Sequence, residues 1–72
     1  MKFKKYKAEY EGKTFVAEQD LPNVGWHLYV YKDGKNTHDF LQDTKEIAMS
    51  QANDDFGVPL NIWVELENDE NS

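Results

Sequence analysis

The chain has 72 residues, of which 39% are hydrophobic and 14% aromatic, and it contains no cysteine. A chain of this length has room for one core, and without cysteine it lacks disulfides, thiol nucleophiles and cysteine ligands for zinc. Fourteen acidic and eight basic residues give a formal net charge of −6, and every basic residue is lysine. Because arginine is the side chain that holds phosphate and guanine through paired hydrogen bonds, we do not expect a nucleic-acid partner.

Charge is unevenly distributed along the chain. Residues 1–13 carry five lysines against two acids, whereas residues 14–72 carry three lysines against twelve acids. The basic segment leaves one alternative open, in which a lysine-rich first strand binds nucleic acid. No apolar stretch follows the basic N-terminus as in a signal peptide, and no apolar run reaches the length of about 18 residues that a membrane helix needs. We therefore expect a cytoplasmic protein without a membrane partner.

The first predicted element is a β-hairpin formed by residues 2–10 and 13–19. Apolar and polar residues alternate in both segments around Glu11-Gly12, a dipeptide typical of tight turns. A two-residue loop sorts the side chains onto an apolar and a polar face, whereas a slip of one residue destroys this sorting. The predicted pairs are Tyr10 with Lys13, Ala8 with Phe15, Tyr6 with Ala17 and Lys5 with Glu18.

A second hairpin is predicted from Trp26 to Gln42, with its turn at Asp33-Gly34. A two-residue turn mixes polar and apolar side chains on each face, so we expect a three-residue loop with a bulge at Gly34. This register places Trp26 opposite Phe40 and Leu28 opposite His38 on one face, and His27 beside Asp39 on the other.

One helix follows the second hairpin. Asp43 is the expected N-cap, with Glu46 three residues later as in a capping box. Apolar residues then recur at helical spacing, and Gly57 and Pro59 end the helix. The residues predicted to face the core are Ile47, Ala48, Ala52 and Phe56.

The last predicted strand spans residues 60–66. Because apolar residues alternate along it, we expect one set to face the core and Trp63 to face away from it. Residues 67–72 have no apolar side chain and are predicted to form a disordered acidic tail, which leaves residues 1–66 as one domain. The predicted core-facing residues of the strand are Leu60, Ile62, Val64 and Leu66.

Counting strand directions predicts the topology. The class is α+β, a single small domain with the element order β-β-β-β-α-β, a mainly antiparallel sheet of strand order 5-1-2-3-4, and the helix on one face. The last strand then pairs with the first. One helix cannot cover both faces of such a sheet, so we expect the other face to be exposed. The residues expected there as a partner-binding site are Trp63, Tyr29, Tyr31, Lys5 and Lys7.

This uncovered face is the main indication of function. Tryptophan and tyrosine are enriched at protein interfaces because they combine a large apolar area with a polar tip. We therefore interpret the protein as a small non-enzymatic interaction module whose partner is another protein or a second copy of itself. We expect no cofactor, no metal and no catalytic residue, because His27 and Asp39 have no serine or cysteine nucleophile beside them.

Two segments resemble known families. Three strands followed by a helix that opens with Asp43-Thr44-Lys45-Glu46 resemble the arm-type DNA-binding domains of some integrases, which implies a sheet lying in a DNA groove. The strand order, with Asp20-Leu21-Pro22 after the second strand, is similar to HicB-like antitoxins. That resemblance implies a small protein that sequesters a partner, so an antitoxin-like or inhibitor-like role is a further alternative.

Overall fold

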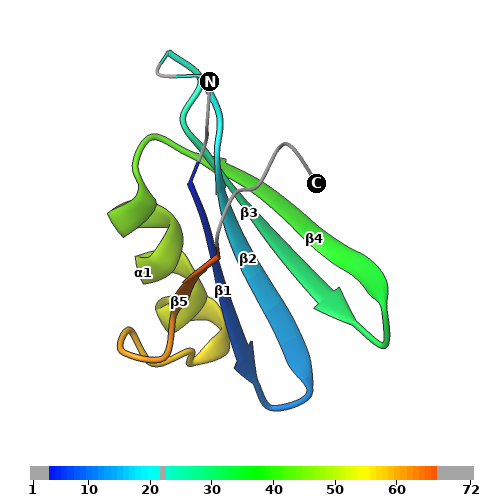
Figure 1. Ribbon diagram of the computed structural model, residues 1–72. Coiled ribbons are helices and arrows are strands. Elements are labelled where there is room, and N and C mark those ends of the chain that lie inside the picture. The colour runs from blue at the N-terminus through cyan, green and yellow to red at the C-terminus, as the bar shows by residue number, and fades with distance from the viewer. Residues whose placement is uncertain (1–3, 22, 67–72) are drawn as a thin grey trace.

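The computed structural model describes residues 4–21 and 23–66. They form a five-stranded antiparallel sheet with one helix packed against it (Figure 1). The spatial order is β4-β3-β2-β1-β5, so the predicted α+β fold and strand order are confirmed. The acidic tail predicted for residues 67–72 lies outside the described residues. The elements are β1 (Lys5–Tyr10), β2 (Lys13–Gln19), β3 (Trp26–Lys32), β4 (Lys35–Gln42), α1 (Lys45–Phe56) and β5 (Val64–Leu66).

The core lies between the sheet and α1, which packs across β2, β3 and β4 (Figure 1). Small alanines on the helix allow its backbone to approach the strands closely. The ring of Phe56 packs against that of Phe15, with centroids 5.3 Å apart, which confirms that Phe56 faces the core. The buried cluster comprises Ala8, Phe15, Leu28, Val30, Ala48, Ala52 and Val58.

The first hairpin has the predicted register. Ala8 pairs with Phe15 and Tyr6 with Ala17, and their side chains face the helix. Both residues of the connecting turn, Glu11 and Gly12, have positive φ, 52° and 79°. Two successive residues with positive φ are typical of the type I′ turn, whose twist matches that of the strands it joins.

The second hairpin turns differently from the prediction. Asp33 and Gly34 form a two-residue turn with φ values of 54° and 78°, instead of a three-residue loop. The bulge lies further along β4, at Thr37, where the pairing shifts between Tyr31 and Val30. The extra residue restores the alternation that a two-residue turn alone would have broken.

The bulge sets the pairing along the rest of β4. Leu28 pairs with Phe40, and His27 pairs with Leu41 rather than with the predicted Asp39. The predicted register is therefore wrong by two residues. Because a shift of two residues preserves side-chain direction, the predicted assignment of residues to faces holds from His38 to Gln42. Before the bulge, Asn36 pairs with Tyr31 instead of the predicted Val30 and so lies on the other face from the one predicted.

The helix begins one residue later than predicted. Thr44 is the N-cap, and its Oγ1 accepts a hydrogen bond from the Ile47 backbone N–H at 3.1 Å, so the assignment of Asp43 is wrong. At the other end Gly57 adopts a φ of 78° and closes the helix, as predicted. Within the described residues, no helix is long and apolar enough to cross a membrane.

The last strand pairs antiparallel with β1, as predicted, but it is shorter and faces the other way. It covers only Val64–Leu66 of the expected range 60–66. Val64 lies opposite Lys7, away from α1, and is 61% exposed, whereas Trp63 packs against the core. Val58, fully buried after the helix, contributes the aliphatic packing expected from this strand.

Candidate functional site

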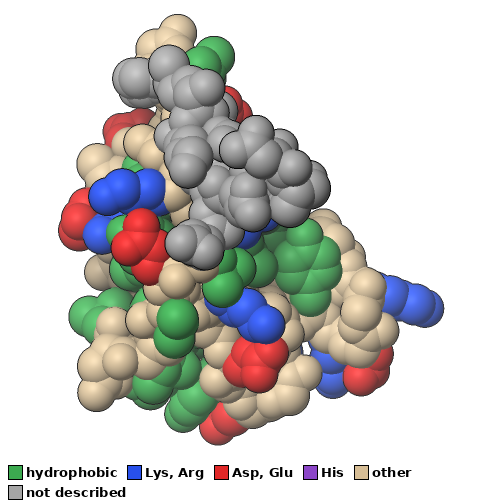
Figure 2. Space-filling model, viewed as in Figure 1, with side chains coloured by type: hydrophobic (Ala, Val, Ile, Leu, Met, Phe, Trp, Pro, Cys, Tyr) green, Lys and Arg blue, Asp and Glu red, His purple; other side chains and the backbone are tan. Residues whose placement is uncertain are grey.

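The face of the sheet opposite α1 carries no other helix or strand of the described residues, and we call it the open face. Strand alternation determines its members, because each residue that points to the helix has neighbours that point away. In the view of Figure 2, hydrophobic, acidic and basic side chains are interspersed on the surface. The open face comprises Lys5, Lys7 and Glu9 of β1, Thr14, Val16 and Glu18 of β2, His27, Tyr29 and Tyr31 of β3, Asp39 and Leu41 of β4, and Val64 and Leu66 of β5.

Three rings form a ladder along β3, in the middle of the open face. The rings of His27 and Tyr29 are stacked, with centroids 5.5 Å apart and an interplanar angle of 11°. Tyr29 and Tyr31 follow at 6.4 Å with a tilted arrangement. All three side chains are half-buried by their neighbours in the sheet. The ladder is therefore a preformed apolar surface that loses little conformational freedom on binding.

Acidic side chains surround the ladder. Asp39 lies opposite Tyr29 on β4, and Glu18 lies opposite His27 on β2. Burial raises the pKa of the Tyr29 phenol above its ordinary 10.0, and the nearby carboxylates of Asp39 and Glu18 raise that pKa further. The β3–β4 half of the open face thus combines aromatic rings with negative charge.

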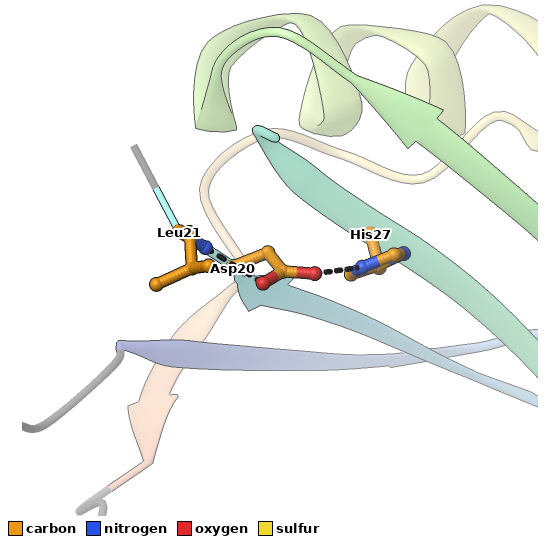
Figure 3. Close-up of polar contacts among 3 residues, drawn as sticks. All are labelled: Asp20, Leu21 and His27. Atoms are coloured by element: carbon orange, nitrogen blue, oxygen red, sulfur yellow. Dashed lines mark hydrogen bonds and ion pairs between the residues drawn. The ribbon is translucent and has the colours of Figure 1, made fainter. Parts of the chain in front are cut away.

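One of these rings is fixed by a carboxylate from the loop after β2. The Nε2 of His27 lies 2.7 Å from the Oδ2 of Asp20 (Figure 3), and since an ionised carboxylate only accepts, the imidazole donates this hydrogen bond. The backbone N–H of Leu21 donates to the other oxygen of Asp20 at 2.7 Å. These two hydrogen bonds, that from His27 first, lower the pKa of the Asp20 carboxyl below its ordinary 3.8. The contact ties the β2–β3 loop to the start of the ladder.

The loop geometry places Asp20 in reach of His27. The Asp20 backbone N–H donates to the Gly25 carbonyl oxygen at 2.8 Å, which closes the loop at its base. Gly25 is required there because a Cβ at this position would lie 2.2 Å from the carbonyl oxygen of Gln42. The carboxylate beside His27 is thus that of Asp20 and not that of the predicted Asp39.

The pair of His27 and Asp20 lacks the other components of a hydrolytic site. Ser50 belongs to α1, which covers the opposite face of the sheet, so no described serine lies beside the imidazole. No group of three or more histidine and acidic side chains occurs among the described residues in an arrangement that could hold a metal ion. The contact between His27 and Asp20 therefore has a structural role in holding the loop and the ring.

Lysines occupy the β1 part of the open face. Lys5 lies opposite Glu18 in the register, and the Nζ of Lys7 lies 3.2 Å from the Oε2 of Glu9. The side chains of Lys7 and Glu9 are 41% and 67% exposed, and an ion pair this open contributes at most about 1 kcal/mol. Lys7 can therefore change partners at little cost. Beside it, Ile62, Val64 and Leu66 line an open depression of about 410 Å³.

Of the predicted site residues, the structure brings four onto one face and separates the fifth. Tyr29 and Tyr31 are in the ladder, and Lys5 and Lys7 lie two strands away on the same face. Trp63 packs against the core, so its expected position on the open face is wrong. Its indole Nε1 is buried and has no hydrogen-bond partner among the described residues.

Comparison of the chain with protein-family models, with curated proteins and with solved structures finds no match. The function of the open face is therefore inferred from its geometry alone. That geometry consists of the aromatic ladder, the carboxylates of Glu18 and Asp39 on either side of it, and the lysines of β1.

Proposed function

We propose that the protein is a non-enzymatic interaction module that binds another protein on its open face. The observation that carries this proposal is the ladder of His27, Tyr29 and Tyr31 on a sheet face that no described element covers. Rigid aromatic side chains at the centre of a polar surface are typical of the anchors that dominate protein interfaces. Tyr29 and Tyr31 are the proposed anchors, and Lys5 and Lys7 the charged rim.

The charges of the open face favour a protein over a nucleic acid. A base stacked on Tyr29 would bring its phosphates close to the carboxylates of Asp39 and Glu18, which flank that ring on both sides. Nucleic-acid affinity depends on phosphate neutralisation, and the two lysines of the face are offset from the ladder by a full strand. A protein surface can instead offer basic groups to the carboxylates and acidic groups to the lysines.

Photo-crosslinking in the native cell tests this proposal. A p-benzoyl-phenylalanine in place of Tyr31 samples the open face, and the same residue in place of the exposed Asp54 on α1 samples the opposite side. We expect protein adducts from position 31 and none above background from position 54. Tyr29→Ser in the position-31 chain should reduce the adducts severalfold, because it removes the central ring of the ladder.

The outcomes separate the alternatives. Adducts to nucleic acid from position 31, or equal protein adducts from both positions, would overturn the proposal. Thermal unfolding of each variant serves as a control, since a chain that no longer folds loses the open face together with its partner. An adduct counts as support whether the captured protein is a different chain or a second copy.

A further inference from the structure

We propose that the occupant of the open face is a second copy of this chain, packed face to face about a twofold axis that runs parallel to the strands between β2 and β3. This inference rests on the proposed function and names its partner. It follows from the order of charges across the sheet, which the register defines. The face is complementary to itself under one twofold rotation and repulsive under the other.

Three rows of side chains cross the open face at right angles to the strands, in the order β4, β3, β2, β1; the row nearest the hairpin turns reads Asn36, Tyr31, Thr14, Glu9 and has no basic member. The first row reads Asp39, Tyr29, Val16, Lys7. The second reads Leu41, His27, Glu18, Lys5. In the first row the acidic Asp39 and the basic Lys7 lie at opposite ends, with Tyr29 and Val16 between them. In the second row the acidic Glu18 and the basic Lys5 are neighbours.

A twofold axis parallel to the strands reverses each row and lays it over its original. In the first row Asp39 then meets Lys7 of the second copy, and Tyr29 meets Val16 of the second copy. In the second row His27 meets Glu18 of the second copy. Every charged group of the first row thus faces a group of opposite sign, and the ring at the centre faces an aliphatic side chain.

A twofold axis at right angles to the strands gives the contrary result. An axis on the first row maps that row onto itself strand by strand, so that Lys7 meets Lys7 and Asp39 meets Asp39, and an axis between the first and second rows brings Lys7 opposite Lys5 of the second copy. Like charges that face each other in an interface oppose association strongly. The charge order therefore selects one of the two face-to-face arrangements, and it does so only for a second copy of the same face.

The packing is feasible for two twisted sheets. Sheets stack face to face about 10 Å apart with their strands within about 30° of alignment, and an axis parallel to the strands produces an aligned pair. The pairs nearest the axis, formed by Tyr29 with Val16, are then in closest contact. Lys7 is available for the outer pair, because its present contact with Glu9 is weak and exposed.

The size of the face sets the expected strength. Four strands about 4.8 Å apart, with five or six residues each at about 3.3 Å, give a footprint of about 350 Å² on each copy, or about 700 Å² in total, which is below the roughly 1,200 Å² at which specific, stable interfaces begin. We therefore expect a dimer that dissociates at micromolar concentrations. Burial of the ladder at the centre and opposite charges at the rim correspond to the usual anatomy of an interface.

Charge reversal in the purified chain tests the arrangement. Sedimentation velocity from about 10 µM to about 1 mM should show a monomer–dimer equilibrium. Asp39→Lys and Lys7→Asp should each raise the dissociation constant by about tenfold or more, because each places like charges opposite one another. The double variant Asp39→Lys with Lys7→Asp should recover the parental dissociation constant, because it exchanges the signs of the same pair.

Matched controls carry the same charge changes outside the rows. Asp54→Lys on α1 and Lys35→Asp at the β3–β4 turn are exposed, and both should leave the dissociation constant within about twofold of the parent. The inference would be overturned if Asp39→Lys left the dissociation constant of the dimer unchanged, or if the double variant still had a raised dissociation constant. A parent chain that remains monomeric at the highest concentration would overturn it as well.

These failures are distinct from failure of the proposed function. A monomeric chain whose position 31 still crosslinks to a different protein would refute the second copy and support the docking role. A dimer that forms normally while position 31 yields no adduct would refute both, because the contact would then lie elsewhere.

Discussion

The two faces of this sheet are formed by the same four long strands and yet differ in every physical property. Toward α1, the side chains of residues such as Leu28 and Val30 are fully buried in the apolar cluster. Away from α1, their chain neighbours His27 and Tyr29 are half-buried, stacked and close to carboxylates. In β3 the even-numbered residues thus pack against the helix and the odd-numbered residues form the open face, so its packing and its surface chemistry can be changed separately.

The largest expected contrast is between one ring from each face. Phe15→Ala, in the core, should cost about 3–5 kcal/mol of unfolding free energy, in a domain stable by only about 4–10 kcal/mol. Tyr31→Ala, on the open face, should cost about 1 kcal/mol or less. Urea denaturation at low protein concentration measures both as monomers. Equal losses would show that the open face belongs to the core.

Substitution of Trp63 tests which side of the last segment of the chain faces the core. Since its ring packs on the core, Trp63→Ala should cost about 2–4 kcal/mol and lower the urea midpoint. Trp63→Phe keeps most of the apolar volume and removes an indole N–H that has no partner among the described residues, so it should stay within about 1 kcal/mol of the parent. If Trp63→Ala unfolded at the parental midpoint, the ring would be on the surface.

A smaller effect comes from one substitution made on both faces. Val30→Thr places a hydroxyl in the fully buried cluster and should cost about 1–3 kcal/mol. Val16→Thr places the same hydroxyl on the half-buried open face and should change the unfolding free energy by about 0.5 kcal/mol or less. The same denaturation series compares them directly, and a reversed order would contradict the assignment of faces.

The smallest expected effect is the pH dependence of the contact between Asp20 and His27. The folded state lowers the pKa of the Asp20 carboxyl, so this contact stabilises the fold above the ordinary pKa of 3.8 and is lost as pH falls through the lower folded value. Asp20→Asn has no carboxyl group, so this pH dependence is absent from the variant. The difference in urea midpoint between parent and variant should therefore be fully present above about pH 5 and shrink in more acidic buffer. A difference that grows with acidity would refute the assignment.

Local sequence signals predicted the first hairpin and the extent of the helix, although Ile47, which was predicted to face the core, is 45% exposed. In the first hairpin, one register alone separates Tyr6 and Ala8 from Lys5 and Lys7, so the polarity pattern is sufficient to predict the register. The N-cap was misplaced by one residue because Asp43 and Thr44 are both good capping residues and only the backbone geometry distinguishes them.

The errors arose where the pattern permits two solutions. In the second hairpin a bulge at Gly34 or at Thr37 produces the same faces from His38 to Gln42, and the choice depends on backbone twist rather than polarity. In the last strand either alternation of side chains buries apolar groups. The observed alternation is the one in which Trp63 packs against the core, together with Val58 from the preceding loop. The contact between Asp20 and His27 joins a loop to a strand. Because loop residues have no periodic pattern, the sequence does not predict this contact.

The bulge at Thr37 also affects the exposed edge of the sheet at β4. β4 is a sheet edge, and a regular edge is a template onto which further chains can add strands without limit. Here the bulge interrupts the edge, and the Asn36 side chain donates hydrogen bonds to the carbonyl oxygens of His38 at 3.0 Å and Val30 at 3.3 Å, so it occupies backbone acceptors of the hairpin. Both features oppose edge-to-edge growth. The proposed twofold contact of the open face, by contrast, closes after two chains and cannot propagate.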